Sequence, residues 1–475
     1  MSPEKLSTSY RNSKDVLIIG GGAAGMAAAV FSAEKGCPVR LFEKNEKLGK
    51  KIYITGKGRC NFTNNCPPED FLSHIVTNPR FLYSSFGSFN NCDAVTFFEH
   101  AGMKTKEERG ARMFPLSDHA SDVTRALQRR MKELGVRVSL NTAVKKILFE
   151  TVPGENPDEK GSRTEGGNSA EEQTASGVSS RKKCVRPKER PNLRVAGVLL
   201  DDGTVVPGSA VIVATGGLSY PSTGSTGDGY RFAREAGMNV TELRPALVPL
   251  ITKEDYIPEM AGLSLRNVTL HIRWGKKKEF CEFGEMLFTH RGVSGPVVLS
   301  ASSFVGAALN DGECSAWIDL KPALSDEQLD ARLIREFDAA KNRELKNVIA
   351  SLLPAKMRPV FTRIAGVPGE KPVRDITKKE RGRLIECIRH FPFTVTGCGT
   401  FNEAIITQGG VSVRELKPST MESKKAEGLF FAGEVIDVDG VTGGFNLQIA
   451  WTTGHAAAEG AALYAEQAGV NEGWE

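Results

Sequence analysis

The stretch that decides the fold is Asp15-Val-Leu-Ile-Ile-Gly20-Gly-Gly22-Ala-Ala-Gly25-Met-Ala-Ala-Ala29. Its apolar run predicts a buried strand, and the alanine-rich residues after the glycines predict a helix. Gly20, Gly22 and Gly25 have the G-x-G-x-x-G spacing, in which the first glycine permits a tight turn, the second admits a phosphate and the third lets helix and strand pack closely. The helix N-terminus offers free N–H groups to a pyrophosphate. The sequence therefore predicts a dinucleotide-binding βαβ unit.

The next strand of this unit is predicted at Val39–Phe42 and ends at Glu43. A carboxylate at that position accepts hydrogen bonds from both ribose hydroxyls and repels a 2′-phosphate. The sequence therefore favours an adenosine without that phosphate.

A second motif lies near the other end of the chain. Gly428-Leu-Phe-Phe-Ala-Gly433-Glu434 predicts a strand that ends in Gly-Glu, and Gly443-Gly-Phe-Asn446-Leu-Gln448-Ile begins a helix. The Gly-Glu end would hold a ribityl chain, and the helix N-terminus would stabilise negative charge on a reduced isoalloxazine. Two such motifs at opposite ends of one chain indicate FAD; the alternative for the second motif is a glycine-rich turn without a cofactor role.

Composition and charge set the class of protein. The 475 residues are 40% hydrophobic and 25% charged, with a formal net charge of +5, which is ordinary for a globular protein of two or three domains. No basic stripe with interleaved aromatic residues indicates nucleic acid. The polar N-terminus is not typical of a signal peptide, and the apolar stretch 16–33 is interrupted by glycines, which disfavours a membrane span.

Nine cysteines are scattered without a CxxC pair. This pattern predicts reduced thiols in a cytoplasmic protein and neither a disulfide framework nor a metal site. Cys60 and Cys66 are the one pair that resembles the redox cysteines of disulfide reductases, but five residues separate them, and the middle of the chain has no second G-x-G-x-x-G for a full NADPH domain. A redox dithiol is thus the weaker alternative.

The order of patterns along the chain predicts an α/β protein: a Rossmann-like FAD-binding domain of two segments, with an inserted β-rich module and a helical module. The first FAD-binding segment is expected at 14–245, and within it 151–192 is so polar that it predicts a disordered insertion. The β-rich substrate module is expected at 246–320, the helical module at 321–393 and the second FAD-binding segment at 394–475.

Four stretches carry a resemblance to a known family: Leu48-Gly-Lys-Lys-Ile-Tyr-Ile-Thr-Gly-Lys-Gly-Arg59-Cys-Asn61-Phe-Thr-Asn64, Ala214-Thr-Gly-Gly-Leu-Ser-Tyr-Pro-Ser-Thr-Gly-Ser-Thr-Gly-Asp228-Gly, Leu287-Phe-Thr-His290-Arg-Gly-Val-Ser-Gly-Pro296, and the closing motif. Together they resemble the bacterial NAD(P)/FAD-dependent oxidoreductases, a family that includes aminoacetone oxidase and 3-dehydro-bile acid delta(4,6)-reductase. The resemblance covers the chain except 1–13 and 151–192.

The motifs and the resemblance together imply a set of cofactor-binding residues. Arg59 and Asn61 would lie near the flavin or its ribityl arm, Val144 would meet the adenine through its backbone, and Thr215 and Gly216 would close over the adenosine. The lysines of the 50–57 loop suit a pyrophosphate, although a solvated surface loop is the alternative. The complete expected set is Gly20, Gly22, Ala24, Gly25, Glu43, Lys44, Lys51, Arg59, Asn61, Val144, Thr215, Gly216, Gly433, Glu434, Gly444, Asn446 and Leu447.

Tyr220 and His290 are the candidate catalytic residues, because both lie in glycine-rich loops of the kind that line a flavin pocket and either could protonate a carbanion or enolate. The alternative is a packed tyrosine and a structural loop histidine. No histidine pair has metal-ligand spacing, so no metal is expected.

The expected function is that of a flavin oxidoreductase that transfers hydride through flavin N5. In the preferred version NAD(P)H reduces FAD, which then reduces the C=C bond of an enone such as a 3-oxo-Δ4 or Δ4,6 bile acid. The alternatives are an amine oxidase acting on an aminoacetone-like substrate with oxygen as acceptor, and a non-catalytic flavin-binding or sensing protein. The expected partner is a small-molecule substrate, without nucleic acid or membrane; the sequence does not reveal the oligomeric state.

Overall fold

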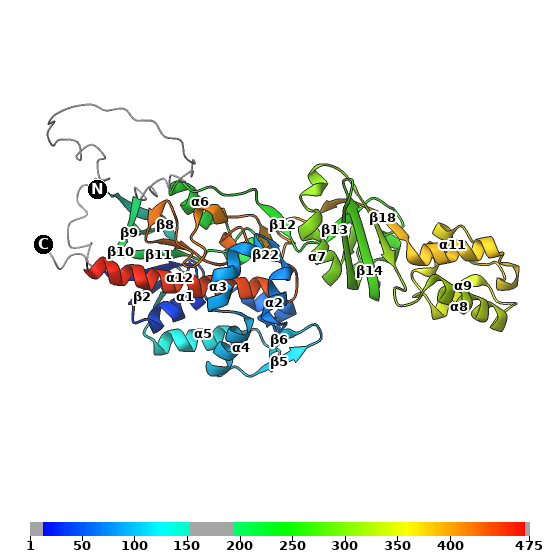
Figure 1. The fold of residues 1–475 in the computed structure, drawn as a ribbon, viewed down its shortest axis with the longest axis horizontal. Helices are drawn as coiled ribbons and strands as arrows, with labels where there is room; N and C mark the ends of the chain where they lie inside the picture. The colour runs from blue at the N-terminus through cyan, green and yellow to red at the C-terminus, as the bar shows by residue number, and fades with distance from the viewer. Residues whose placement is uncertain (1–12, 153–192, 471–475) are drawn as a thin grey trace, which may run out of the picture.

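The computed structural model describes residues 13–152 and 193–470. The expected insertion at 151–192 therefore lies almost entirely outside the described residues. Three parts follow one another along the long axis of the molecule: a Rossmann-like domain, a β-barrel and a helical module (Figure 1). No helix within the described ranges combines the length and the apolar composition that a bilayer crossing requires.

A five-stranded parallel sheet forms the centre of the Rossmann-like domain, in the order β21-β11-β1-β2-β7. The apolar runs predicted from the sequence form its middle strands. Their bounds are Val16–Ile19 (β1), Val39–Phe42 (β2), Arg137–Ser139 (β7), Ala210–Val213 (β11) and Leu429–Phe431 (β21). Because β21 pairs with β11 in parallel, the C-terminal segment completes the sheet that the N-terminal segment begins. The predicted two-segment Rossmann-like domain is therefore confirmed.

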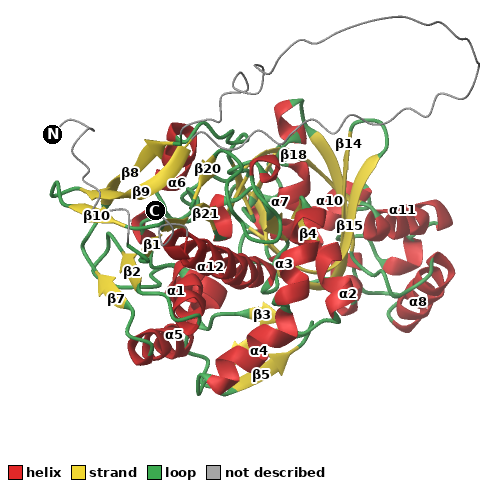
Figure 2. Cartoon of the chain, turned by 60° about the vertical axis from the view of Figure 1, so that its left-hand side comes forward, coloured by secondary structure: helices red, strands yellow, loops and turns green. Residues whose placement is uncertain are grey.

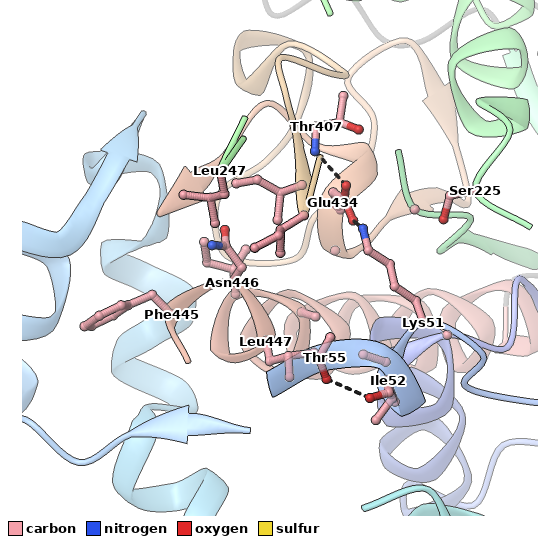
Figure 3. A pocket seen from close by; sticks show the side chains of 18 of the residues that line it. Lys51, Ile52, Thr55, Ser225, Leu247, Thr407, Glu434, Phe445, Asn446 and Leu447 are labelled. Carbon is pink, nitrogen blue, oxygen red and sulfur yellow. Dashed lines mark hydrogen bonds and ion pairs between the residues drawn. The ribbon is translucent and has the colours of Figure 1, made fainter. Parts of the chain in front are cut away.

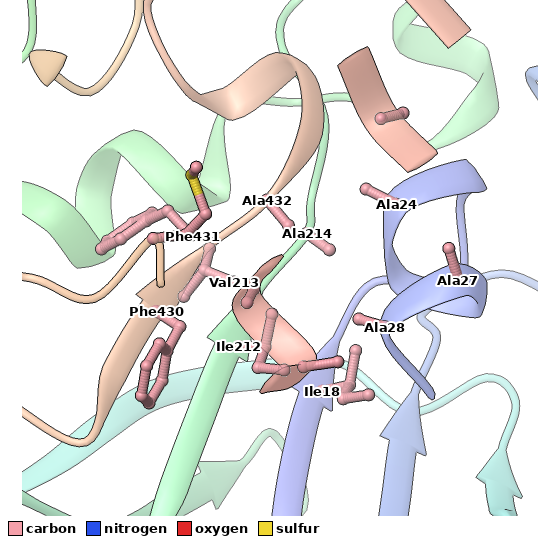
Figure 4. Close-up of a cluster of buried hydrophobic side chains, with 14 of the residues drawn as sticks. Ile18, Ala24, Ala27, Ala28, Ile212, Val213, Ala214, Phe430, Phe431 and Ala432 are labelled. Atoms are coloured by element: carbon pink, nitrogen blue, oxygen red, sulfur yellow. The ribbon is translucent and has the colours of Figure 1, made fainter. Parts of the chain in front are cut away.

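Two helices rich in small residues pack together against this sheet. They are α1 (Ala23–Glu34) and α12 (Phe445–Val470). Gly454 of α12 has no room for a side chain, since a Cβ there would lie 2.8 Å from the carbonyl oxygen of Ala24. Ala24, Ala27 and Ala28 of α1 lie beside buried residues of the strands, among them Ile18 (Figure 4). The alanine and glycine content of both segments therefore permits a close helix–helix approach.

Smaller elements surround the Rossmann core (Figure 2). The helices are α2 (Pro68–Phe71), α3 (Tyr83–Ser88), α4 (Asn91–His100), α5 (Ser121–Glu133) and α6 (Asp228–Glu235). The strands β3 (Thr63–Asn64), β6 (Arg112–Pro115) and β5 (Thr105–Glu108) form one sheet, and β4 (Ile75–Thr77) pairs with β22 (Asp439–Gly440). A further sheet contains β8 (Val144–Thr151), β9 (Leu193–Leu200), β10 (Val205–Pro207) and β20 (Ala426–Glu427).

The β-rich module is a closed barrel with the strand order β13-β16-β15-β14-β17-β18. Its strands are β13 (Leu250–Thr252), β14 (Ser264–Trp274), β15 (Lys278–Phe288), β16 (Gly292–Ser294), β17 (Cys314–Asp319) and β18 (Phe391–Cys398). Helix α7 (Pro296–Val305) packs on β15. Two strands, β12 (Arg244–Ala246) and β19 (Ile406–Gln408), pair where the chain leaves and re-enters the Rossmann-like domain.

The helical module contains α8 (Asp326–Ala339), α9 (Leu345–Val348), α10 (Arg358–Ala365) and α11 (Lys378–Arg389). It is inserted between the barrel strands β17 and β18. The boundary expected between 393 and 394 divides β18, whose pairing with both β13 and β17 closes the barrel. The insertion therefore continues past that boundary, and the barrel is built from both sides of the helical module.

Candidate active site

One cavity of about 1660 Å³ lies between the Rossmann-like domain and the barrel. Its walls come from the first glycine turn, the 49–61 loop, the start of α12, and the barrel segments 282–287 and 295–299. Binding pockets for a single small ligand usually measure about 300–1,000 Å³. The cavity therefore has room for a dinucleotide and a second molecule beside it.

The glycine turn forms one end of the cavity. Gly20 has φ +103°, and a Cβ on Gly25 would lie 1.8 Å from the carbonyl oxygen of Gly20, so these two glycines let the turn and α1 pack closely. A Cβ on Gly22, by contrast, would have no atom of the described residues within 4 Å. Gly20, Gly22 and Ala24 line the cavity, whereas Gly25 lies behind them. The open space in front of Gly22 and the helix N-terminus fits a pyrophosphate.

Glu43 lies beside this turn and is 7% exposed. One carboxylate oxygen accepts a hydrogen bond from the Gly21 N–H at 2.7 Å, and the other accepts one from the Asn45 N–H at 2.8 Å. The second oxygen also accepts a hydrogen bond from the Asn45 side-chain amide at 2.6 Å, so the oxygen bound to Gly21 is the one that retains a free lone pair for a ribose hydroxyl. Glu43 lines the cavity as expected, and the two backbone bonds fix its orientation.

One side of the cavity is formed by residues of two loops and the first residue of β8. Lys44 lines it and forms an ion pair with Asp228 at 2.7 Å. Val144, Thr215 and Gly216 also line it. The hydroxyl of Thr215 is buried without a hydrogen-bond partner among the described residues. Because a buried hydroxyl is normally paired, this group fits a polar atom of a bound nucleotide.

Glu434 is the centre of a hydrogen-bond network in the middle of the cavity (Figure 3). Its carboxylate accepts from Lys51 Nζ at 2.6 Å, from the Ser219 hydroxyl at 2.7 Å and from the Thr407 N–H at 2.8 Å. Gly433, directly before it, has φ +78°, and a Cβ there would lie 2.7 Å from the Ala24 Cβ. Both motifs therefore meet here, which brings Lys51 and Glu434 to the same place between the two ends of the cavity.

Arg59 and Asn61 both line the cavity. The guanidinium of Arg59 lies over the Phe114 ring at 4.3 Å and forms ion pairs with Glu108 and Asp118, the latter at 2.7 Å. These acidic partners raise the pKa of Arg59 and hold its charge at the sheet of β5 and β6. Asn61 has a buried side-chain oxygen without a hydrogen-bond partner among the described residues. Asn61 is thus the better placed of the two to accept a hydrogen bond from a ligand.

The start of α12 forms the opposite end of the cavity. Gly443 and Gly444 have φ of +122° and +100°, and a Cβ on Gly444 would lie 2.5 Å from the carbonyl of Thr63. The side chain of Asn446 is engaged with the backbone of Gly440, donating at 2.7 Å and accepting at 2.9 Å. Asn446 and Leu447 line the cavity, with Asn446 fixing the turn through these bonds. The first N–H groups of α12 remain available to negative charge.

The side of the cavity that faces the barrel has an apolar wall, formed by Leu247, Phe283, Met286, Leu287, Pro296, Leu299, Ile405 and Ile406. Four polar residues of the barrel strands β14 and β15 also line this side: Ser264, Asn267, Glu282 and Glu285. Arg109, exposed in the turn between β5 and β6, and the half-buried Arg112 at the start of β6 also border the cavity. An apolar wall with a few polar groups is typical of a site for an organic substrate.

The two catalytic candidates from the sequence lie elsewhere. The described residues that line the cavity include neither Tyr220 nor His290. Tyr220 has φ +52° and precedes the short 3₁₀ turn Pro221–Thr223, and His290 is exposed in the turn between β15 and β16. The structure therefore corrects this expectation: the glycine-rich loops are placed as expected, but these two side chains are not on the cavity.

Several titratable residues on the cavity were not found from the sequence, among them His74, Asp439 and Glu282. His74 precedes β4 and Asp439 lies in β22, and these strands pair. Asp439 is 1% exposed, and burial raises its pKa to about 6. Asp439 could have been found from the sequence, because an acidic residue stands there directly before Gly440 and the glycine turn of the closing motif. No comparable sequence pattern marks His74.

The cysteines of the 60–66 segment do not form a disulfide. Cys60 is fully buried, and this burial raises the pKa of its thiol to about 12. A thiol that remains protonated is a poor redox nucleophile. Within the described ranges, no group of three or more His, Cys, Asp or Glu side chains is arranged to hold a metal ion.

Comparisons with known proteins place this site in context. Residues 14–162 match the model of the HI0933-like protein Rossmann domain, and residues 244–406 match that of the HI0933-like protein barrel and H2TH domain. The chain is 30% identical over 445 residues to the ribosomal RNA dihydrouridine synthase of Haemophilus influenzae, an alignment that covers 93% of this chain and 97% of the relative. It is 28% identical over 448 residues to the 3-dehydro-bile acid delta(4,6)-reductase of Clostridium scindens, covering 94% and 98%.

Among solved structures, the 3-ketosteroid delta1-dehydrogenase of Sterolibacterium denitrificans is similar with a TM-score of 0.49 and 14% identity, over 94% of this chain and 99% of that one. The match to the HI0933-like Rossmann domain, together with the cradle described above, supports FAD as the ligand of this cavity.

Proposed function

Since the chain belongs to the HI0933-like protein family, a family of FAD-dependent oxidoreductases, we propose that it reduces a carbon–carbon double bond conjugated to a carbonyl group, with NAD(P)H as the electron donor. The observation that carries this proposal is the single cavity that joins the dinucleotide cradle to the apolar wall of the barrel. A substrate against that wall would lie beside the cofactor in the same cavity.

The names of the two relatives describe one type of reaction. Dihydrouridine is uridine in which a double bond conjugated to a ring carbonyl has been reduced. A delta(4,6)-reductase that acts on a 3-dehydro bile acid reduces ring double bonds in the presence of a 3-oxo group. The reaction type is therefore shared, although the substrates differ greatly in size and charge.

The side chains and backbone of this protein bind and orient the reactants. Bound FAD supplies the hydride, from N5 of its reduced ring. Gly22 and the start of α1 would hold the pyrophosphate, and Lys51 and Glu434 would bind the ribityl chain. The N–H groups at the N-terminus of α12 would stabilise negative charge on the reduced flavin.

The apolar wall favours a 3-oxo-Δ4 or Δ4,6 steroid acid as the substrate. Leu247, Met286, Leu287 and Leu299 offer hydrocarbon contacts that suit a fused-ring skeleton. A uracil base within RNA is the second candidate, since Arg109 and Arg112 border the cavity and Arg109 is exposed, as phosphate-binding arginines are.

An anaerobic stopped-flow experiment tests the proposal. The purified yellow protein is reduced with NADH or NADPH, and the flavin absorbance is followed after mixing with a 3-oxo-Δ4 bile acid, a uridine-containing RNA, free uridine or air. Fast reoxidation by the bile acid, with a product heavier by two hydrogens, supports the steroid version; fast reoxidation by RNA supports the second candidate. Reduction by aminoacetone and reoxidation by air indicates an amine oxidase. If neither enone nor uridine reoxidises the flavin, the proposed reaction is wrong.

A further inference from the structure

Hydride transfer to an enone leaves a negative charge that a proton must neutralise, so the cavity needs a proton donor. Tyr220 and His290 are not on the cavity. His74 is the histidine that lines it, and it lies on the wall that β4 and β22 form next to the start of α12.

The ring of His74 is held in one orientation. It stacks on the ring of Phe445, the first residue of α12, with centroids 4.4 Å apart and an interplanar angle of 7°. Phe445 is itself 3% exposed and packs against Phe71 at 5.0 Å. The backbone is fixed as well, because the carbonyl oxygen of His74 accepts from the Val441 N–H at 3.0 Å. The ring is therefore attached to the glycine turn at the start of α12.

The hydrogen bonds of His74 also determine which nitrogen is available. Nδ1 lies 3.1 Å from the carbonyl oxygen of Asp70 and 3.3 Å from the Ser73 hydroxyl, and that hydroxyl donates to the same carbonyl at 2.6 Å. A carbonyl oxygen only accepts, so Nδ1 carries a proton. Nε2 has no partner among the described residues and remains as the nitrogen that can exchange a proton with a ligand.

We propose that His74 is the proton donor of the reduction, acting through Nε2 on the substrate that lies in the cavity. This inference rests on the proposed function. The β-carbon of the conjugated double bond gains a hydride, and its two electrons form the new C–H bond. The former π pair moves to the α-carbon, which takes the proton from Nε2. The imidazole is left neutral, with Nδ1 still protonated, and regains its proton from solvent at the mouth of the cavity; NAD(P)H restores the electrons.

Asp439 does not fit this role as well as His74. It lines the same wall, but it is 1% exposed, and one of its oxygens is 3.3 Å from the Gln408 side-chain amide, which also donates to the carbonyl oxygen of Ser303. These contacts make Asp439 part of the junction between the Rossmann-like domain and α7. His74 is half-buried, and can exchange protons with both substrate and solvent.

The test compares His74→Asn with His100→Asn in the flavin-loaded protein. His100 is an exposed histidine at the end of α4, outside the cavity. Each half-reaction is measured separately. We expect His74→Asn to bind FAD and to be reduced by NAD(P)H at the wild-type rate, while its reoxidation by the preferred enone or uridine substrate slows by about 10²–10⁴-fold. His100→Asn should retain the wild-type rates in both half-reactions.

Two further readouts separate proton donation from a structural effect. Wild-type reoxidation should slow in D₂O, and this solvent isotope effect should change in His74→Asn. In His74→Gly, added imidazole should restore much of the lost reoxidation rate. Unchanged reoxidation in His74→Asn overturns the role of His74 while leaving the proposed function intact. A wild-type enzyme that no conjugated substrate reoxidises overturns the proposed function itself.

Discussion

Asp439 should make the stability of this protein depend on pH in a direction opposite to that of most carboxylates. It lies in β22, 1% exposed, with one oxygen 3.3 Å from the Gln408 amide and the other buried without a partner among the described residues. Desolvation is the main cause that raises its pKa to about 6, with smaller contributions from Asp437 and Glu434. Ionising this side chain in the folded protein is therefore costly.

The magnitude follows from the difference between the folded and unfolded pKa. An aspartate in an unfolded chain has a pKa of about 3.9, and each pKa unit is worth about 1.4 kcal/mol, so the full effect is about 3 kcal/mol. The folded pKa is the higher one, so this stability is complete below about pH 4 and is lost as the pH rises to about 6. At about 2.1 cal/mol/K per residue, 3 kcal/mol corresponds to a change of about 3 °C in the melting temperature of this chain.

The assay is thermal melting of the flavin-loaded Asp439→Asn variant and of wild type across this pH range. The asparagine keeps an oxygen for the Gln408 amide but cannot ionise. The melting temperature of the variant minus that of wild type should therefore increase by about 3 °C as the pH rises. Any cost of its unpaired amide N–H is independent of pH and cancels in this comparison. Asp202→Asn is the control: a hydrogen bond from the Thr204 N–H lowers the pKa of Asp202, so this side chain is ionised throughout the range and the variant should not gain on wild type as the pH rises. A constant gap between Asp439→Asn and wild type at every pH would refute the reasoning.

Three other outcomes test the site. Gly22→Val should fold with the wild-type circular dichroism spectrum but be colourless, because its side chain enters the open space for the pyrophosphate and meets no described residue; a yellow variant would overturn the assignment of that turn. Lys51→Met should weaken FAD binding and destabilise the protein by about 1–3 kcal/mol, since it leaves Glu434 without its cationic partner at 2.6 Å; unaltered flavin affinity by titration contradicts this. Tyr220→Phe and His290→Asn should keep wild-type rates of flavin reoxidation. A large decrease of that rate in either variant would show that the residue takes part in the reaction.

The parts of the fold that local patterns specify were predictable from the sequence. β1 and β2 are short apolar runs next to glycines or charged residues, and they occur at the expected residues. The place of β18 in the fold was harder to predict. It belongs to the barrel because it pairs with β17, and the whole helical module separates these two strands in the sequence. A strand pattern indicates that a strand is present but not which sheet contains it.

The same distinction explains the site. Gly20, Gly25 and Gly444 are required by backbone contacts, and those contacts are features of the motif itself. The side-chain roles depend on which face of a loop turns inward, which a glycine-rich sequence does not specify. Tyr220 and His290 illustrate this limit, since both occupy the expected loops while their side chains lie off the cavity.

The pairing of β4 with β22 shows why sequence motifs can fail to identify a residue of the site. Ile75 and Thr77 of β4 are partners of Gly440 and Asp439, which lie near the other end of the chain. That pairing places the segment before β4 next to the glycine turn of α12, and with it His74. A motif search at either end finds the glycines but not the histidine, because the histidine reaches the cavity only when the two terminal segments have joined in one sheet. Proton donation in this protein therefore depends on the same long-range assembly that forms the cofactor cradle.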